Sequence, residues 1–164
     1  MTNSDGARQA GGPPIICVRG PSGSGKTALC ERLIGALGRM GERVGYVKRT
    51  HHPLDLPHKA SSRIWRSGAA AMVLRSTDRV QVTLPDGETS VEDLVALLPA
   101  GITLVLLETH EPEPYPSILS MRLSPAEGEE VIARWELECL DDDVCGVLAA
   151  VLGEIRREAS SARK

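Results

Sequence analysis

Short apolar runs separated by amphipathic segments make up most of this chain. Residues 15–18 and 102–107 are continuous runs of Ile, Val, Leu, Thr and Cys, which predict strands buried on both faces. Apolar residues recur at helical spacing from Thr27 to Met40, and a last helix is predicted after the three aspartates at 141–143. Strands that alternate with helices predict an α/β fold with a mainly parallel central sheet.

The shorter elements follow from the same patterns. We expect further strands at 44–48, 70–74, 118–123 and 131–137, and short helices at 61–67 and 90–98. The polar residues 81–89 contain the turn signal Pro85-Asp86-Gly87, which predicts a β-hairpin insertion at about 80–90, on the edge of the sheet. The apolar face of the last helix is expected to consist of Val144, Val147, Leu148, Val151, Leu152 and Ile155.

One glycine-rich segment carries the strongest chemical signal. Gly20, Gly25, Lys26 and Thr27 satisfy the pattern G-x-x-x-x-G-K-[ST], and the segment lies between a predicted strand and a predicted helix. The backbone N–H groups of such a loop cradle phosphates, the lysine bridges the β- and γ-phosphates, and the threonine hydroxyl coordinates Mg²⁺. The expected phosphate-binding residues are Gly20, Ser22, Gly23, Ser24, Gly25, Lys26, Thr27 and Ala28. The sequence therefore predicts a P-loop NTPase-like three-layer fold.

Other candidate residues follow the predicted strands at the same edge of the sheet. Glu108 ends the most apolar run, where it could hold Mg²⁺ or orient a water, and the alternative is a solvated strand-end carboxylate. Lys48, His51 and His52 follow the second strand and could contact phosphates or substrate; a plain surface loop and a metal site remain alternatives. Lys26 and Glu108 are the candidate catalytic residues, and Thr27 and Glu108 the candidate metal ligands.

Composition narrows the choice of compartment and partner. The formal net charge is −3 and no basic run occurs, so we expect no nucleic-acid partner. No apolar run approaches about 18 residues, so no membrane span is predicted and the protein is expected in the cytoplasm. Four cysteines without C-x-x-C spacing are expected to be reduced, buried thiols. We expect one domain at 15–158, a disordered tail at 1–14 and a frayed end at 159–164.

Several motifs together resemble the MobB family. The P-loop is followed by Lys48, Thr50, His51 and His52, which match the family pattern K-H-T-H-H, and by a buried strand that ends in Glu108. Gly68 and Ala69 match a later A-G-A, and the resemblance covers residues 15–122. It implies binding of GTP, a part in attaching GMP to molybdopterin during molybdenum cofactor biosynthesis, a partner nucleotidyltransferase, and pairing of subunits as a homodimer.

Four positions depart from the family pattern. Ala60 replaces the acidic residue of K-D-S, and Thr103 stands where the family has an Asp. Thr109 and Glu111 replace the glycine and the lysine of V-E-G-F-K. Fewer carboxylates remain for Mg²⁺, so hydrolysis and the choice of base stay open.

Three functions remain at this stage. The favoured one is a MobB-like accessory protein that binds GTP and Mg²⁺ with weak or no GTPase activity. A small-molecule P-loop kinase that uses ATP is the second, since Arg63, Arg66, Arg75 and Arg79 could supply charges around the γ-phosphate. The third is a degenerate nucleotide-binding module without hydrolysis. For Arg63 and Arg66 a solvated helix face is the favoured interpretation, and no role is assigned to His110.

Overall fold

A computed structural model describes residues 12–50, 54, 59–85 and 89–162 of the chain. The described residues fall into two compact units. The first contains the residues up to Arg49 and those from Leu94 onward, and the second runs from Thr50 to Asp93. Each unit is described below by itself.

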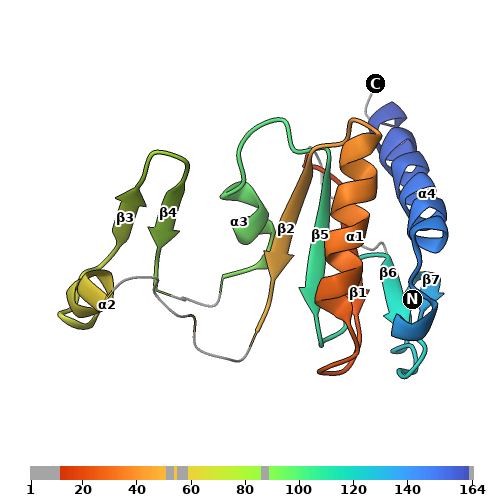
Figure 1. The fold of residues 1–164 in the computed structure, drawn as a ribbon, viewed down its shortest axis with the longest axis horizontal. Helices are drawn as coiled ribbons and strands as arrows, with labels where there is room; N and C mark the ends of the chain where they lie inside the picture. The colour runs from red at the N-terminus through yellow and green to blue at the C-terminus, as the bar shows by residue number, and fades with distance from the viewer. Residues whose placement is uncertain (1–11, 51–53, 55–58, 86–88, 163–164) are drawn as a thin grey trace, which may run out of the picture. The chain divides into compact units, whose positions relative to one another are not determined.

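The first unit is built on a five-stranded sheet in the order β2-β5-β1-β6-β7 (Figure 1). Every neighbouring pair in this sheet is parallel, which confirms the predicted α/β fold. Parallel strands end at one edge of a sheet, so the segments that follow them meet there. The strands are β1 Ile15–Arg19, β2 Val44–Lys48, β5 Leu104–Thr109, β6 Ser117–Ser120 and β7 Val131–Trp135.

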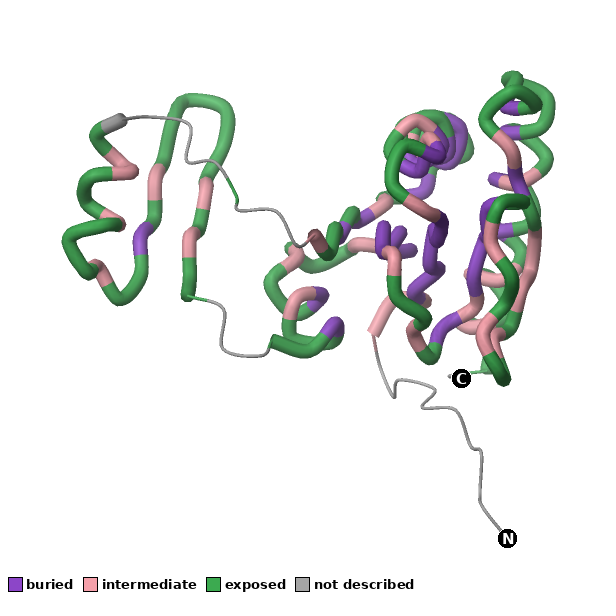
Figure 2. Tube along the Cα trace, turned by 90° about the horizontal axis from the view of Figure 1, so that it is seen from below, coloured by how far each residue is buried: buried purple, intermediate pink, exposed green. Residues whose placement is uncertain are grey.

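Two helices, α1 Lys26–Arg39 and α4 Asp142–Ser161, pack side by side against the sheet (Figure 1). Burial concentrates on the inner strands and on the inward side of α1, as Figure 2 shows. Every residue of β1 and β5 is buried, as the continuous apolar runs predict. The core between helices and sheet includes Ile16, Val18, Leu29, Leu33, Leu37, Leu104, Leu106 and Ile118.

The buried face of α4 agrees with the predicted one in part, since Leu152 is buried and Leu148 and Ile155 pack against the core. Val144, Val147 and Val151 are exposed, at 39%, 66% and 38% of their surface. The buried residues of the helix are Leu152 and the three small residues at 145, 149 and 153, which are Cys, Ala and Gly. The small side chains let α4 approach α1 closely, which shifts the buried face away from the three valines.

The second unit contains α2 Lys59–Arg66 and an antiparallel hairpin of β3 Met72–Arg75 and β4 Val80–Thr83. The Ser76 hydroxyl accepts hydrogen bonds from the backbone N–H of Asp78 and Arg79, at 3.4 and 3.1 Å, which fixes the turn between the strands. The hairpin therefore forms a two-stranded sheet of its own, with its turn at 76–79. The prediction of a hairpin at 80–90 on the edge of the main sheet was wrong in position, and residues 86–88 of that turn signal lie outside the described part.

Helix α3 Val91–Ala96 crosses the boundary between the units, close to its predicted range. The segment after it packs on β2, where a Cβ on Gly45 would lie 2.6 Å from Leu98 Cδ1. None of the described helices is long and apolar enough to cross a membrane. All four cysteines are free, as predicted; three are buried, but Cys139 is exposed, so the prediction of burial was wrong for that residue.

Candidate functional site

The P-loop connects the carboxyl end of β1 to the first turn of α1. Gly23 and Gly25 adopt φ of 71° and 90°, a backbone region that side chains disfavour, so the glycines of the motif are needed for this path. Gly25 is the N-cap of α1 and has no side chain to bind the first N–H groups of the helix. Those groups can instead bind an anion at the positive end of the helix dipole.

Lys26 lies within the loop. Only 6% of the residue is exposed, and its ammonium donates to the carbonyls of Gly20 and Pro21, both at 2.9 Å. Burial lowers the pKa of this ammonium, and the nearby Glu108 carboxylate partly opposes that effect. The lysine is thus held by two neutral acceptors, which phosphate oxygens could replace at a gain in electrostatic energy.

Glu108 stands next to Thr27, as parallel pairing of β1 and β5 requires. The Thr27 hydroxyl lies 3.0 Å from both carboxylate oxygens. Tyr46, on β2, donates its hydroxyl proton to Oε2 at 2.6 Å, and the Lys48 ammonium lies 3.1 Å from Oε1. Three donors from two elements therefore surround one carboxylate that is only 3% exposed.

These contacts set the charge state of Glu108. Burial alone would raise the pKa of this carboxyl, but the hydrogen bonds from Tyr46, Lys48 and Thr27 outweigh it and hold the pKa below its ordinary value. Burial, followed by the hydrogen bond to Glu108, raises the pKa of the Tyr46 hydroxyl, which stays protonated as the donor. The site thus presents a permanent anion beside the P-loop.

The residues present fit a magnesium ion. A threonine hydroxyl and a carboxylate are hard oxygen ligands, and Mg²⁺ commonly takes one or two such groups together with phosphate oxygens and water. Thr27 and Glu108 already lie 3.0 Å apart. The Lys48 ammonium forms an ion pair with the Glu108 carboxylate, so a positive charge already lies beside this carboxylate.

The other predicted phosphate-binding residues occupy the same loop. Ser22 and Gly23 are exposed, whereas Ser24 is buried and donates to the Pro21 carbonyl at 2.8 Å. Ala28 follows in α1 and is half-buried. His51 and His52 lie outside the described residues.

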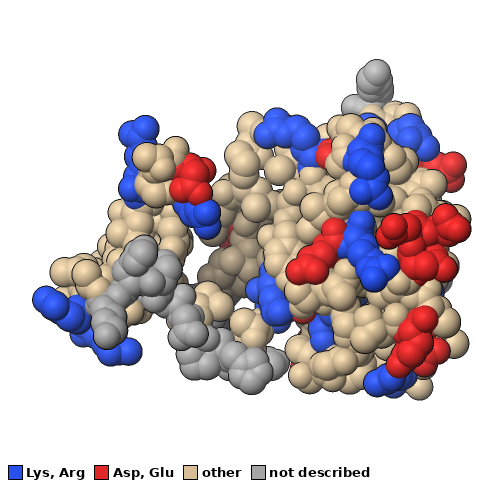
Figure 3. Space-filling model, viewed as in Figure 1, with Lys and Arg blue, Asp and Glu red and all other residues tan. Residues whose placement is uncertain are grey.

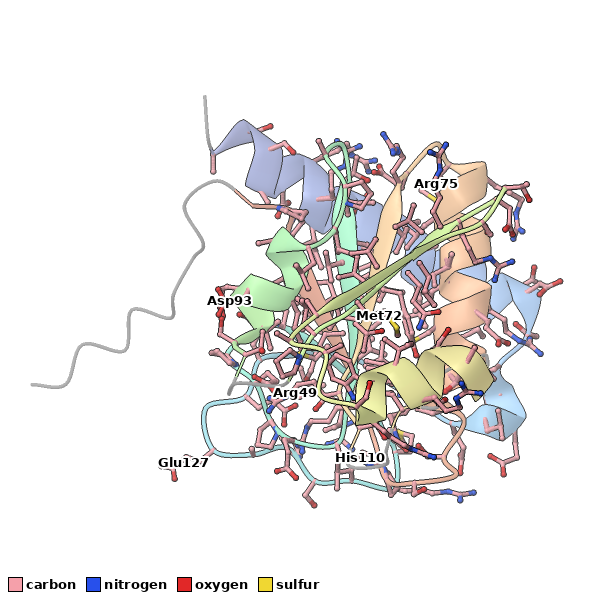
Figure 4. All side chains as sticks on the ribbon, turned by 90° about the vertical axis from the view of Figure 1, so that its left-hand side faces the viewer. Arg49, Met72, Arg75, Asp93, His110 and Glu127 are labelled. Atoms are coloured by element: carbon pink, nitrogen blue, oxygen red, sulfur yellow. The ribbon has the colours of Figure 1, made fainter. Side chains whose placement is uncertain are left out.

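Several remaining candidates lie elsewhere or have other partners. Arg49 forms an ion pair with Glu113, and His110 accepts a hydrogen bond from Arg19 through its backbone carbonyl; both are labelled in Figure 4. Arg63 and Arg66 are exposed on α2, in the second unit.

The four departures from the family pattern have structural roles or exposed positions. The Thr103 hydroxyl donates to Glu42 at 2.6 Å, and Thr109 is buried with its hydroxyl bound to the backbone of Glu111. Ala60 is exposed on α2. Thr103 therefore satisfies a neighbouring carboxylate where an Asp would repel it.

Sequence reasoning missed two features of this region. Tyr46 contacts Glu108, and alternation along β2 would have shown that it shares a face with Lys48. Arg19, the residue before Gly20, forms a buried bidentate pair with Glu129, at 2.8 and 2.6 Å. No motif marks that pair, since its members are 110 positions apart.

Comparison with known proteins identifies the family. Residues 15–137 match the family model MobB, described as molybdopterin guanine dinucleotide synthesis protein B. A molybdopterin-guanine dinucleotide biosynthesis adapter protein of Escherichia coli is 38% identical over 79 residues, and its counterpart in Haemophilus influenzae is 34% identical over 113 residues. The matched segments cover 46% and 66% of this chain but only 45% and 64% of those two relatives.

Solved structures agree on the fold. The crystal structure of Bacillus subtilis MobB superposes with a TM-score of 0.60, covering 85% of this chain and 98% of that one, at 18% sequence identity. Such low identity supports the architecture alone. Because the family model spans well over half of the chain, this protein belongs to the MobB family.

Proposed function

We propose that this protein is a GTP-binding accessory protein of molybdenum cofactor biosynthesis. It would hold GTP and Mg²⁺ on the P-loop and deliver nucleotide to, or regulate, the nucleotidyltransferase that attaches GMP to molybdopterin. Two relatives named molybdopterin-guanine dinucleotide biosynthesis adapter proteins support this pathway. The convergence of Lys26, Thr27 and Glu108 at one end of the sheet carries the proposal.

In the nucleotide complex, Lys26 exchanges two backbone carbonyls for phosphate oxygens. The backbone N–H groups from Gly23 to Ala28 would surround the β-phosphate, and the lysine would bridge the β- and γ-phosphates. Because the ammonium already lies inside the loop, little reorganisation is needed.

A divalent cation would take the place that Lys48 occupies beside Glu108. Thr27 and Glu108 would hold the Mg²⁺, and the Lys48 ammonium, which is 43% exposed, could then turn from Glu108 toward the phosphates. Tyr46 can keep its hydrogen bond and hold the carboxylate in place during this exchange. The metal would neutralise phosphate charge when it is bound.

The lowered pKa of Glu108 supports the expectation of weak or absent hydrolysis. A carboxylate whose pKa is held below its ordinary value is a poor general base, since catalytic efficiency is greatest when the pKa is near the working pH. The same contacts make it a good metal ligand. The site is therefore better suited to binding GTP than to cleaving it.

A reconstituted transfer reaction tests the accessory role. Purified nucleotidyltransferase, molybdopterin-loaded acceptor, GTP and Mg²⁺ are mixed with this protein, and formation of the guanine dinucleotide is followed by chromatography. We expect the unaltered chain to raise the yield at limiting GTP and Lys26→Ala not to do so. Arg39→Ala, an exposed arginine at the other end of α1, is the matched control and should behave like the unaltered chain. Equal yields with and without the protein would contradict the role.

A further inference from the structure

A cavity of about 390 Å³ lies at the edge of the main sheet where the strands begin. Pro13 and Pro14, which line it, precede β1, and the lining residues Ile102 and Thr103 precede β5. In Figure 1 both strands run from this edge toward the P-loop. α1 begins at the P-loop and runs back toward this edge, and its 14 residues span about 20 Å at about 1.5 Å per residue. The cavity is therefore separate from the nucleotide site.

The walls of the cavity are mainly apolar and are held by packing. Val95, Leu98, Pro99 and Ile102 contribute to them. A Cβ added to Gly45 of β2 would lie 2.6 Å from Leu98 and 3.1 Å from Ile102, so these two side chains are pressed onto the sheet. Val95 is only 8% exposed. The apolar walls are thus already formed in the protein without a ligand.

One buried ion pair adjoins the cavity. Arg156, which lines the cavity from α4, donates through Nε and Nη2 to Oε1 of Glu42 at 3.0 and 2.5 Å. The Thr103 hydroxyl donates to Oε2 of the same carboxylate at 2.6 Å. Glu42 is only 9% exposed. Both of its oxygens are therefore occupied by donors of the protein, and it neutralises one guanidinium.

Positive charge and hydrogen-bond donors remain beside this pair. Arg156 Nη1 forms no hydrogen bond within the part of the chain that the structure describes. A second guanidinium, that of Arg43, lies over the lining residue Gly101, since a Cβ added to this glycine would be 2.6 Å from Arg43 Nη1. Ser160, one helical turn after Arg156, adds a hydroxyl to the lining. Two guanidinium groups and one carboxylate thus leave one positive charge in excess.

We propose that this cavity binds a small organic monoanion with a flat apolar body, such as an aromatic carboxylate. Small-molecule sites commonly have volumes of about 300–1,000 Å³, apolar walls and a few convergent polar groups, which is the combination found here. The carboxylate would accept from Arg156 Nη1 and from the Ser160 hydroxyl, which now donates to the Arg156 carbonyl at 3.0 Å. The ring would pack on Leu98 and Ile102. A single excess charge matches a monoanion, whereas a neutral ring would leave it without a partner.

A pair of ligands that differ in charge tests this assignment. Calorimetry measures binding of 2-naphthoate and of the neutral 2-naphthol to the unaltered chain, and Lys26→Ala reports whether the P-loop takes part. Arg156→Gln removes the proposed donor, and Ser160→Trp fills the cavity while it leaves the pair of Arg156 with Glu42 in place. Arg157→Gln is the matched control, because Arg157 is the next residue of α4, has a side chain that is 55% exposed and does not line the cavity.

The expected result is selective binding of the anion at this edge of the sheet. 2-Naphthoate should bind the unaltered chain, Lys26→Ala and Arg157→Gln equally, and 2-naphthol about 10-fold more weakly. Arg156→Gln and Ser160→Trp should each weaken 2-naphthoate binding about 10- to 100-fold. If Arg156→Gln does not fold, Ser160→Trp decides the question.

Three results would overturn the assignment. They are no heat of binding at millimolar 2-naphthoate, equal affinity for the anion and the neutral ligand, and an affinity that Ser160→Trp leaves unchanged. Loss of 2-naphthoate binding in Lys26→Ala would also overturn it, because the anion would then occupy the P-loop. Binding of GTP is measured separately, so failure of the nucleotide site and failure of this cavity are distinguishable.

Discussion

At the scale of single residues, two buried charges beside the P-loop are neutralised in different ways. Glu108 is held by Thr27, Tyr46 and Lys48, and the last of these is 43% exposed and can leave. Arg19 and Glu129 instead form a closed pair with side-chain exposures of 6% and 2%. The first arrangement suits a site that must accept a cation, and the second fixes the loop between β6 and β7 to the end of β1.

Removing one member of the closed pair should destabilise the fold. Arg19→Met leaves Glu129 buried with hydrogen bonds from Ser117 and Ala126 but without a counter-charge. Breaking a buried ion pair in this way typically costs about 3–5 kcal/mol of unfolding free energy. Urea unfolding at neutral pH measures the loss. Arg39→Met, at an exposed arginine of α1, should change the free energy by no more than about 0.5 kcal/mol.

The same pair predicts a pH dependence of stability. Burial would raise the pKa of Glu129, but bonds from Arg19, Ala126 and Ser117 lower it below the ordinary value of 4.5. A depressed folded-state pKa contributes stability above the unfolded-state value, and this contribution disappears as the pH falls through the folded-state value. The unaltered chain should therefore lose stability more steeply below pH 4.5 than Arg19→Met does. Parallel slopes for the two proteins would show that the pair does not set the pKa of Glu129.

At the scale of elements, the junction of the P-loop with α1 depends on backbone conformation. Gly25 has φ of 90° and contacts Leu137, whereas Gly38 lies in the last turn of α1 with open space around its Cα. Gly25→Ala should lower the free energy of unfolding by roughly 1–2 kcal/mol and weaken triphosphate binding, because the backbone of the loop must change its conformation. Gly38→Ala should raise the free energy of unfolding by about 0.5–1 kcal/mol, because alanine has the higher helix propensity, and should leave triphosphate binding unchanged. Thermal unfolding and nucleotide titration of both variants distinguish these effects; equal behaviour of the two would contradict a conformational role for Gly25.

Most elements could be predicted from the sequence because their patterns are local. The continuous apolar runs of β1 and β5 and the helical spacing of α1 indicate both type and place. The inward side of α4 was predicted in part: Leu148, Leu152 and Ile155 face the core, whereas three small residues that allow close approach to α1 take the place expected for the valines. Hydropathy alone also could not show that Met72–Arg75 pairs with Val80–Thr83 in a separate sheet.

At the scale of the whole molecule, the sequence predicted the architecture and the proximity of Thr27 and Glu108. The P-loop motif specified Lys26 and Thr27, and the carboxylate at the end of the most apolar strand does lie against Thr27. Tyr46, which contacts Glu108, and Leu137, which lies beside Gly25, could not be predicted from motif spacing, because they are distant from these residues in the sequence. The division into two compact units was not expected either, since the apolar run at 70–74 resembles a strand of the main sheet.

The charge of the whole molecule fits local binding of a nucleoside triphosphate rather than general binding of a polyanion. Over α1 and α4, basic and acidic side chains are interspersed on the face drawn in Figure 3. The net charge of −3 opposes general attraction to nucleic acid. Anion binding is therefore expected where local geometry provides it, at the P-loop.

Calorimetric titration with GTP tests the central claim most directly. The unaltered chain is titrated with GTP and with ATP, each in Mg²⁺ and in EDTA, beside Lys26→Ala, Glu108→Gln and the control Arg39→Ala. We predict that GTP binds more tightly than ATP, that Lys26→Ala abolishes binding, and that Glu108→Gln removes the difference between Mg²⁺ and EDTA. Arg39→Ala should match the unaltered chain. Triphosphate binding that persists unchanged in Lys26→Ala, or no binding by the unaltered chain, would contradict a nucleotide site on this P-loop.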